Sequence, residues 1–351
     1  MTARSILDHC ISIAGVRRVI GIDIGGTKIS AAHVDESGKI TNRLERPTDP
    51  RAVTKSAISL VHELQGKGAA QAIGVAFAGW VEHPSGLIAL APNLPNAEKN
   101  LGPRLAEAAG LAVLVENDVN AAVWAELILG AGIGESNVVM LAVGTGLGGG
   151  IVIDGDLYRG SRGFAGEFGH MTVVSEGASR FESGGSQPLT LTGRPSWPLL
   201  PPGPPCACGR TGCLESVASG TALARLARER IGEEPGSVIV ELVGGDLDKI
   251  TGEAVGEAAA AQDPFALRLF EEVGTYLGIG IASVARAFDP DVVIVGGGVA
   301  DIGEALLGPA RAELGRRFEG QAPPPKVVPA ALGNDAGMIG AALLARQNGG
   351  S

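Results

Sequence analysis

Three of the chain's four cysteines lie in one short segment, and this cluster constrains the fold more strongly than any other sequence feature. Cys206 and Cys208 are separated by one residue, and Cys213 follows after four more. Three thiolates and one imidazole form a closed tetrahedral zinc site, and we select His170, which follows Glu-Phe-Gly, as the imidazole. The alternative is three buried or free cysteines in a loop, which would not require this spacing. The sequence therefore predicts that two distant segments meet at a metal ion.

A closed metal site of this kind is structural because no coordination position is left for water. The ion would hold its neighbouring segments in place, and these include Glu167 and Glu215, which could bind a substrate. Between His170 and the cysteines, residues 175–205 are rich in proline, glycine and serine, which predicts a mobile surface loop. Metal ligation would fix both ends of that loop.

The bulk properties of the chain narrow the class of protein. A length of 351 residues is long for one hydrophobic core and fits two lobes. A net charge of −10 argues against a nucleic-acid surface, which would require a basic stripe. The sequence shows no signal-peptide pattern, and no apolar run is long enough for a membrane span. We therefore expect a cytoplasmic protein that binds neither nucleic acid nor membranes, in a reducing compartment where clustered cysteines bind metal.

Segments with strand and helix patterns alternate along the chain, which predicts the α/β class. The predicted strands are Val19–Ile24, Lys28–Val34, Ala72–Phe77, Ala112–Glu116, Asn137–Val143, Gly150–Asp154 and Val292–Val295. The predicted helices are 50–66, Leu101–Gly110, Val119–Leu129, Ser219–Ile231, Pro264–Phe288 and Asp335–Gln347.

A weak internal repeat links two distant parts of the chain. Ile22–Lys28 and Leu141–Gly149 both consist of a strand, a glycine turn with a threonine, and a second strand. Turns of this kind present backbone N–H groups in a concave array that binds anions such as phosphate. Two such turns, one in each lobe, could hold the phosphates of one nucleotide between them.

The first turn contains an acid, two glycines, a hydroxyl and an amine. We expect Thr27 and Lys28 to face phosphate beside Gly25 and Gly26, and Asp23 to hold a hydrated magnesium ion. The alternative is an ordinary hairpin turn with a surface lysine. The segment is not a P-loop, because the Gly-x4-Gly-Lys-Ser/Thr pattern is absent from the sequence.

The second turn, with Thr145 and Gly146, formally matches the Gly-x-Gly-x-x-Gly pattern of dinucleotide-binding proteins. In those proteins a helix follows, whereas here a strand pattern follows, so a phosphate-binding hairpin is favoured over a nicotinamide site. Glu167, about 20 residues further on, keeps the nicotinamide alternative open. Gly297 and Gly298, which follow a predicted strand, could let adenosine approach the backbone or could serve close strand–helix packing.

Glu-Asn-Asp-Val-Asn at 116–120 opens a predicted helix. One interpretation is capping, because Asn117 or Asp118 would be a good N-cap. The other makes Asp118 a general base that accepts the proton of an alcohol attacking a γ-phosphate, with Asn117 orienting a sugar hydroxyl. Asn93 lies in a rigid, polar turn, which turn chemistry alone could explain.

Glu167, His170 and Glu215 are fixed polar groups of the kind that bind sugars through paired hydrogen bonds. If His170 gives one ring nitrogen to zinc, the other is free to donate to a ligand. The alternative is that both glutamates are solvated loop charges.

Taken together, these motifs resemble the ROK family (repressors, open reading frames and sugar kinases), and within it the bacterial glucokinases. The resemblance covers about residues 18 to 346, and its most specific part is Glu-x-Gly-His with Cys-x-Cys-Gly-x-x-Gly-Cys-x-Glu. Its motifs are Asp23–Lys28, Pro92-Asn93, Glu116–Asn120, Gly144–Gly150, Glu167–His170, Cys206–Glu215, Gly296–Val299 and Leu332–Gly337. Two features depart from the family: the long stretch 175–205, and Ala97, which replaces an aromatic residue of many relatives.

The resemblance implies an actin-like, hexokinase-like (ribonuclease H-like) duplicated fold with a cleft between two lobes. Residues 1–117 with 335–351 would form the small lobe, and residues 118–334 the large lobe. It implies MgATP across the two glycine turns, structural zinc on His170 and the three cysteines, and a homodimer or tetramer. The implied sugar ligands are Asn93, Asn117, Asp118, Glu167, His170 and Glu215, with Asp118 as the base.

The expected activity is therefore ATP-dependent phosphorylation of the 6-hydroxyl of glucose. Another hexose or N-acetylhexosamine (N-acetylmannosamine, N-acetylglucosamine, fructose or allose) stays open as the substrate, because one sequence does not display the shape of a pocket. Polyphosphate stays open as the donor. A sugar-responsive transcription regulator is disfavoured by the short segment before Asp23 and by the acidic charge.

Overall fold

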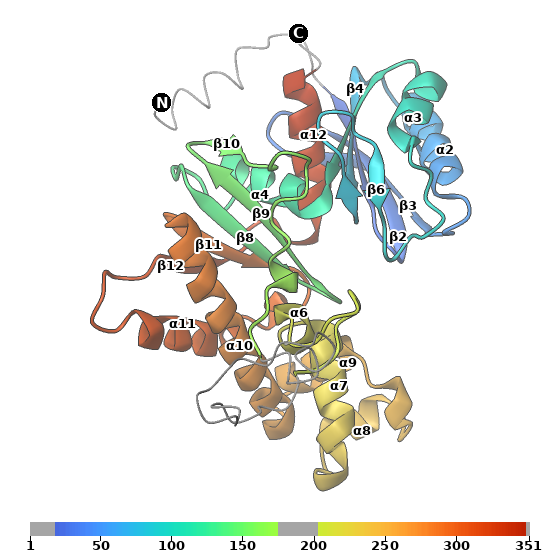
Figure 1. Ribbon diagram of the computed structural model, residues 1–351. Helices are drawn as coiled ribbons and strands as arrows, with labels where there is room; N and C mark the ends of the chain where they lie inside the picture. Colours follow the sequence, from blue (N-terminus) through green and yellow to red (C-terminus); the bar gives the residue numbers. More distant parts are fainter. Residues whose placement is uncertain (1–17, 175–202, 349–351) are drawn as a thin grey trace, which may run out of the picture.

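The protein is built around two five-stranded sheets with the same strand order and the same strand directions (Figure 1). The computed structural model describes residues 18–174 and 203–348. The predicted loop at 175–205 therefore lies almost entirely outside the described residues.

The first sheet has the order β3-β2-β1-β4-β7. Its strands are β1 (Val19–Ile24), β2 (Lys28–Val34), β3 (Ile40–Pro47), β4 (Ala72–Phe77) and β7 (Ala112–Asn117). The first three strands pair antiparallel, whereas β1, β4 and β7 run parallel. The carboxyl ends of β1, β4 and β7 therefore meet at one edge of the sheet.

The second sheet has the order β10-β9-β8-β11-β12. Its strands are β8 (Val138–Val143), β9 (Leu147–Ile153), β10 (Asp156–Leu157), β11 (Val292–Gly296) and β12 (Lys326–Pro329). Again the first three pair antiparallel and β8, β11 and β12 run parallel. The α/β class and the duplication predicted from the two glycine turns are confirmed.

The prediction that a strand begins only at Gly150 was wrong, because β9 begins at Leu147 and contains the glycine run. The three glycines pair with Met140, Leu141 and Ala142 of β8. They also leave room for neighbours: a Cβ on Gly149 would lie 2.3 Å from Phe168 Cδ2. The glycines therefore serve close packing inside a strand and are not the turn itself.

Strand β3 escaped sequence analysis because its residues are polar and mostly exposed, as is common at a sheet edge. A short hairpin of β5 (Trp80–Val81) and β6 (Ile88–Leu90) was also missed, together with β10 and β12. Helix α11 (Glu304–Phe318) was missed although it is long, and it contains Pro309 in its interior.

Two helices lie between the sheets, and each follows the last parallel strand of its own half (Figure 1). Helix α4 (Asp118–Leu129) follows β7, and α12 (Ala336–Asn348) follows β12. They cross closely, since a Cβ on Gly340 of α12 would lie 1.7 Å from Ala121 O of α4. Helix α12 also packs on the first sheet, where a Cβ on Gly74 would meet Ala341 O at 2.0 Å.

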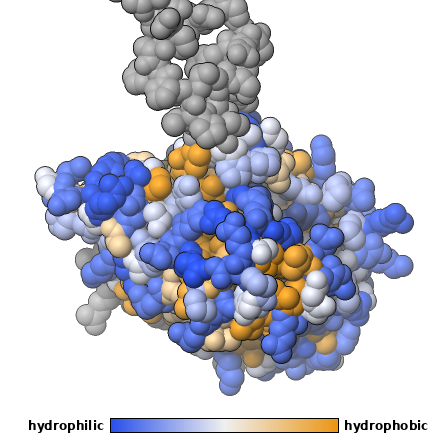
Figure 2. Space-filling view, turned by 90° about the horizontal axis from the view of Figure 1, so that it is seen from below, coloured by the Kyte–Doolittle hydropathy of each residue, from blue (hydrophilic) through white to orange (hydrophobic). Residues whose placement is uncertain are grey.

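The remaining helices cover the outer faces. Helices α2 (Val53–Gln65) and α3 (Leu101–Ala109) enclose one core with the first sheet. The larger core of the second half is formed with helices α6 (Leu214–Val217), α7 (Gly220–Arg230), α8 (Val238–Leu242), α9 (Gly252–Ala260), α10 (Pro264–Phe288) and α11. Seen from below, from the end where α7 and α8 lie, the surface is mostly hydrophilic with smaller hydrophobic patches (Figure 2).

No helix within residues 18–174 and 203–348 combines the length and the apolar character that crossing a membrane would require. The lobe boundaries given by the sequence stay a prediction.

Candidate functional site

Two carboxylates lie at the edge where the parallel strands of the first sheet end. Asp23 is the penultimate residue of β1, and Asp118 directly follows β7 as the first residue of α4. Both side chains are partly buried. The Asp118 Oδ1 atom accepts hydrogen bonds from Asn117 Nδ2 (3.0 Å) and Val119 N (3.0 Å). Its Oδ2 atom receives no side-chain hydrogen bond from the described residues.

Burial raises the pKa of both carboxyl groups, and neighbouring negative charges add to this effect. Burial, the charge of Asp23 and, more weakly, the charge of Glu167 raise the pKa of Asp118 to about 7. Burial and the charge of Asp335 raise the pKa of Asp23 to about 6, against an opposing effect of Lys28. A carboxylate with a pKa near neutrality is suited to accept a proton, and a cluster of such groups favours a bound cation.

The contacts of Asn117 are those of a helix cap. Its Oδ1 atom accepts from Val119 N (2.9 Å) and Asn120 N (3.0 Å). Its Nδ2 atom donates to Gly79 O (3.1 Å) and to Asp118 Oδ1. The capping interpretation therefore describes this residue, which also orients the carboxylate beside it. A role of Asn117 in binding sugar stays a prediction.

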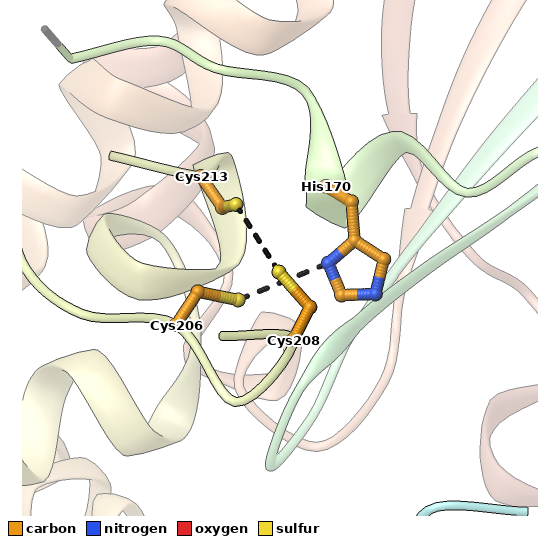
Figure 3. Close-up of side chains that lie close together, drawn as sticks. All are labelled: His170, Cys206, Cys208 and Cys213. Atoms are coloured by element: carbon orange, nitrogen blue, oxygen red, sulfur yellow. Dashed lines mark hydrogen bonds between the residues drawn. The ribbon is translucent and has the colours of Figure 1, made fainter. Parts of the chain in front are cut away.

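The four residues that the sequence selected as metal ligands converge in the large half (Figure 3). Their ligand atoms all lie within 4.8 Å of one another. Cys206 Sγ lies 3.8 Å from His170 Nδ1, and Cys208 Sγ lies 3.7 Å from Cys213 Sγ. Thiolates about 2.3 Å from a tetrahedral zinc ion would be about 3.8 Å apart. The residues present therefore fit a four-coordinate metal ion.

Local folding explains how these ligands meet. His170 ends the short 3-10 helix Phe168–His170, and the loop before Cys213 turns at Gly209 and Gly212, both with positive φ. The main chain joins the two segments through Leu214 N, which donates to Met171 O at 2.8 Å.

Glu167, His170 and Glu215 lie together beside the thiols. His170 turns Nδ1 toward Cys206 and leaves Nε2 4.0 Å from Glu167 Oε2. Burial raises the pKa of Glu167, and the charge of Glu215 adds to this, whereas His170 opposes it. Glu215 Oε1 receives a bond from Cys206 Sγ at 3.6 Å, and Oε2 receives one from Leu147 N at 2.9 Å. Glu215 thus joins the cysteine cluster to the strand after the second glycine turn.

The second glycine turn opens into a pocket of about 750 Å³. Thr145 and Gly298, both selected from the sequence, line it together with residues from α7 and α9. Gly297 lies behind Gly298 with φ of 87°, and a Cβ there would be 2.5 Å from Val143 O. Close packing thus explains Gly297, whereas a Cβ on Gly298 would meet no atom within 4 Å and would face open space. Gly146 packs against Glu215, whose Oε2 atom would lie 2.5 Å from a Cβ.

The first glycine turn lies beside Asn93, whose Cβ would be 3.2 Å from a Cβ on Gly26. Gly25 N donates to Lys28 O at 3.1 Å, which closes the turn, and Thr27 is exposed. Lys28 Nζ pairs with Glu45 Oε1 at 3.2 Å on the surface. Lys28 would have to exchange this exposed partner to contact a phosphate.

Sequence reasoning missed three residues near these groups. Trp80 donates a side-chain hydrogen bond that lowers the pKa of Glu167. The charge of Asp335 raises the pKa of Asp23, and Arg159 forms an ion pair with Glu116. Each lies far in sequence from its partner, so local spacing carried no signal, although Asp335 stood within a motif of the family resemblance.

Comparisons with known proteins identify the family. The sequence model of the ROK family matches residues 19–348, which is nearly the whole described chain. The chain belongs to the ROK family.

Among ROK proteins, the chain is 39% identical to a glucokinase from Streptomyces coelicolor over 93% of this chain and 97% of that protein. It is 33% identical to an N-acetylmannosamine kinase from Citrobacter koseri over 93% of this chain and 98% of that protein. A crystal structure of a ROK family glucokinase from Streptomyces griseus, in complex with glucose and AMPPNP, is 39% identical with a TM-score of 0.80. That match covers 94% of this chain and 99% of the other, and the predicted two-lobe, hexokinase-like fold is confirmed.

Proposed function

We infer that this protein is an ATP-dependent glucokinase that phosphorylates the 6-hydroxyl of glucose. The observation that carries this inference is the similarity to glucokinases over almost the whole chain, including one solved with glucose and an ATP analogue.

Asp118 would act as the general base. The sugar hydroxyl must lose its proton as it attacks the γ-phosphorus, and a carboxylate within hydrogen-bond reach can accept it. The bonds from Asn117 and Val119 fix Oδ1, which leaves Oδ2 for that proton. With a pKa of about 7, the group is largely ionised just above neutral pH and still basic enough to accept a proton.

The nucleotide would lie between the two halves. The pocket beside Thr145 and Gly298 has room for a nucleoside, and the glycine turns would bind its phosphates through Gly25, Gly26, Thr27, Lys28 and Gly146. Asp23 fits a hydrated magnesium ion because burial raises the pKa of this carboxyl group, and a nearby cation would stabilise its charged form. The ion would supply neutralisation of charge on the phosphoryl oxygens.

The sugar would lie against the wall formed by Glu167, His170 and Glu215, with Asn93 and Asn117 on the opposite side. Zinc on His170 Nδ1 and the three thiolates would hold this wall, and it would leave His170 Nε2 free toward the ligand. The ion would be structural because the four ligands complete its coordination.

The similarity to an N-acetylmannosamine kinase favours a second candidate, phosphorylation of an N-acetylhexosamine. A coupled kinase assay over a panel of glucose, fructose, allose, N-acetylmannosamine and N-acetylglucosamine, with ATP and with polyphosphate, decides between them. The highest kcat/KM is expected for glucose with ATP. A preference of tenfold or more for an N-acetylated sugar would replace glucose as the substrate.

Assembly and location stay predictions of the sequence and the family. We expect a homodimer or tetramer in the cytoplasm, and light scattering on the purified protein measures the first of these directly.

A further inference from the structure

A mostly buried ion pair joins the two halves of the molecule, and its carboxylate, Glu116, lies two residues before Asp118 in the chain. Arg159 Nε lies 2.6 Å from Glu116 Oε2, and the two side chains are only 18% and 6% exposed. Glu116 is in β7 of the first sheet, whereas Arg159 follows β10 of the second. A pair removed from water at this depth persists only where both partners are well bonded.

The other carboxylate oxygen of Glu116 accepts hydrogen bonds from the residues around the proposed base. Glu116 Oε1 accepts from Asn117 N at 3.0 Å and from Asn120 Nδ2 at 3.1 Å. Asn117 in turn donates through Nδ2 to Asp118 Oδ1 at 3.0 Å. An unbroken series of hydrogen bonds therefore leads from the Arg159 guanidinium to the Asp118 carboxylate.

We propose that Arg159, acting through Glu116, is a positioning residue that holds Asp118 in the orientation required of the base. This proposal rests on the proposed function of Asp118. Arg159 itself would not touch the sugar or the phosphate. Its guanidinium fixes Glu116, Glu116 fixes the first turn of α4, and that turn carries the carboxylate.

The segment that carries Arg159 has other attachments to the first half, which makes the effect on catalysis separable from sugar binding. His83 N donates to Arg162 O at 3.1 Å. Phe164 stacks against Trp80 with ring centroids 5.2 Å apart. These contacts hold the approach to Glu167 without the ion pair, so loss of Arg159 should leave the sugar wall in place.

The test compares Arg159→Met with the wild-type protein at saturating glucose and ATP. We expect kcat to fall about 10- to 100-fold, because a misplaced base loses reactivity steeply with distance. The dissociation constant of glucose, measured by calorimetry without nucleotide, should rise by a smaller factor than kcat falls, because Glu167, His170 and Glu215 stay in place and binding does not require the proton transfer. A merely structural role would instead lower stability and leave kcat per folded molecule unchanged.

The matched control is Arg162→Met, three residues further along the same segment. The Arg162 guanidinium lies over the Phe164 ring, 5.2 Å from its centroid, and the side chain is exposed. This variant should keep kcat within about twofold, since exposed cation–π contacts contribute little.

Two further variants keep the proposal falsifiable. Arg159→Lys retains the charge with a different donor geometry and should lower kcat by less than Arg159→Met, so it decides the matter if the methionine variant does not fold. Arg159→Met combined with Glu116→Gln should be less impaired than the two single effects multiplied, because no unpaired buried carboxylate remains.

These experiments distinguish failure of the proposed kinase function from failure of the positioning role of Arg159. If the wild-type protein phosphorylates no sugar in the panel, the proposed function is wrong. If the wild type is active and both Arg159 variants keep kcat within twofold, the positioning role is overturned while the kinase stands.

Discussion

The two halves of this protein share one topology but differ in the chemistry of their strand ends. Asp23 is the penultimate residue of β1, and Ala142 occupies the same position in β8 of the second half. Asp118 directly follows β7, whereas Ala330 directly follows β12. Carboxylates therefore lie at the strand ends of the first half, and small uncharged residues at those of the second.

The connections into the two central helices show the same contrast. Helix α4 begins immediately after β7, and its first residue is the proposed base. The segment between β12 and α12 is longer than the direct junction of β7 and α4. Its Ala331 and Leu332 N–H groups donate hydrogen bonds to Glu126 of α4. The two equivalent edges thus differ: carboxylates stand at the strand ends of the first, whereas the main chain beyond β12 in the second is held by Glu126 of α4.

Asp118→Asn removes the base and should have the largest effect. The amide keeps an oxygen that can accept from Val119 N but cannot take the proton, so we expect kcat to fall about 10³- to 10⁴-fold. Glucose binding measured by calorimetry should stay within about threefold. Near-normal turnover in this variant would rule Asp118 out as the base and remove the main asymmetry between the halves.

Asp23→Ala gives the first half the residue found at the equivalent position of the second. We expect kcat to fall about 10²-fold, because the substitution removes the carboxylate proposed to hold magnesium beside the transferred phosphoryl group. Steady-state assays over a range of magnesium concentrations should show a weaker dependence on the ion with a higher half-saturating concentration. An unchanged magnesium dependence would contradict the assignment of Asp23.

Cys208→Ser tests whether the metal ion shapes the sugar wall of the second half. We expect metal content, measured by atomic emission, and glucose affinity to fall together, the affinity by about tenfold. Ala207→Ser is the matched control, since it adds a hydroxyl to the same exposed loop and removes no ligand. Full glucose affinity in a metal-free protein would show that the ion does not hold the wall.

Adjacent glycines separate nucleotide binding from packing in the second half. Gly298→Ala should raise the KM for ATP about tenfold, or about 1.4 kcal/mol, with unchanged stability, because its Cβ would meet only the open pocket. Gly297→Ala should lower the free energy of unfolding by about 1–3 kcal/mol, since φ is 87° and the added Cβ would lie 2.5 Å from Val143 O. Steady-state kinetics give the KM for ATP of both variants, and urea denaturation gives their free energies of unfolding. Equal effects of the two substitutions on KM would show that Gly298 has no special role in nucleotide binding.

Sequence patterns predicted the elements that bury a continuous apolar face, such as β1, β4 and α10. They also predicted that His170 meets the cysteines: the spacing of the cysteines is typical of metal ligands, and His170 was selected because it follows Glu-Phe-Gly. They could not predict β3, whose polar residues resemble a loop, or the start of β9, where glycines serve packing against Phe168. The contact of Arg159 with Glu116 was equally hidden, because it depends on how the two halves meet.

The proposed role of Asp118 as the base depends on a pKa near neutrality. The most direct measurement is a carbon-13 NMR titration of the Asp118 carboxyl in the ligand-free protein, with Asp118→Asn to assign the signal. We expect a midpoint near pH 7, raised from the usual 3.8 by burial and by Asp23, so that the proton-accepting form is lost as the pH falls below that point. The acid limb of kcat/KM for glucose should follow the same midpoint. A midpoint below about pH 5, with activity retained there, would show that Asp118 has an ordinary carboxyl pKa and that the proposed tuning of the base is wrong.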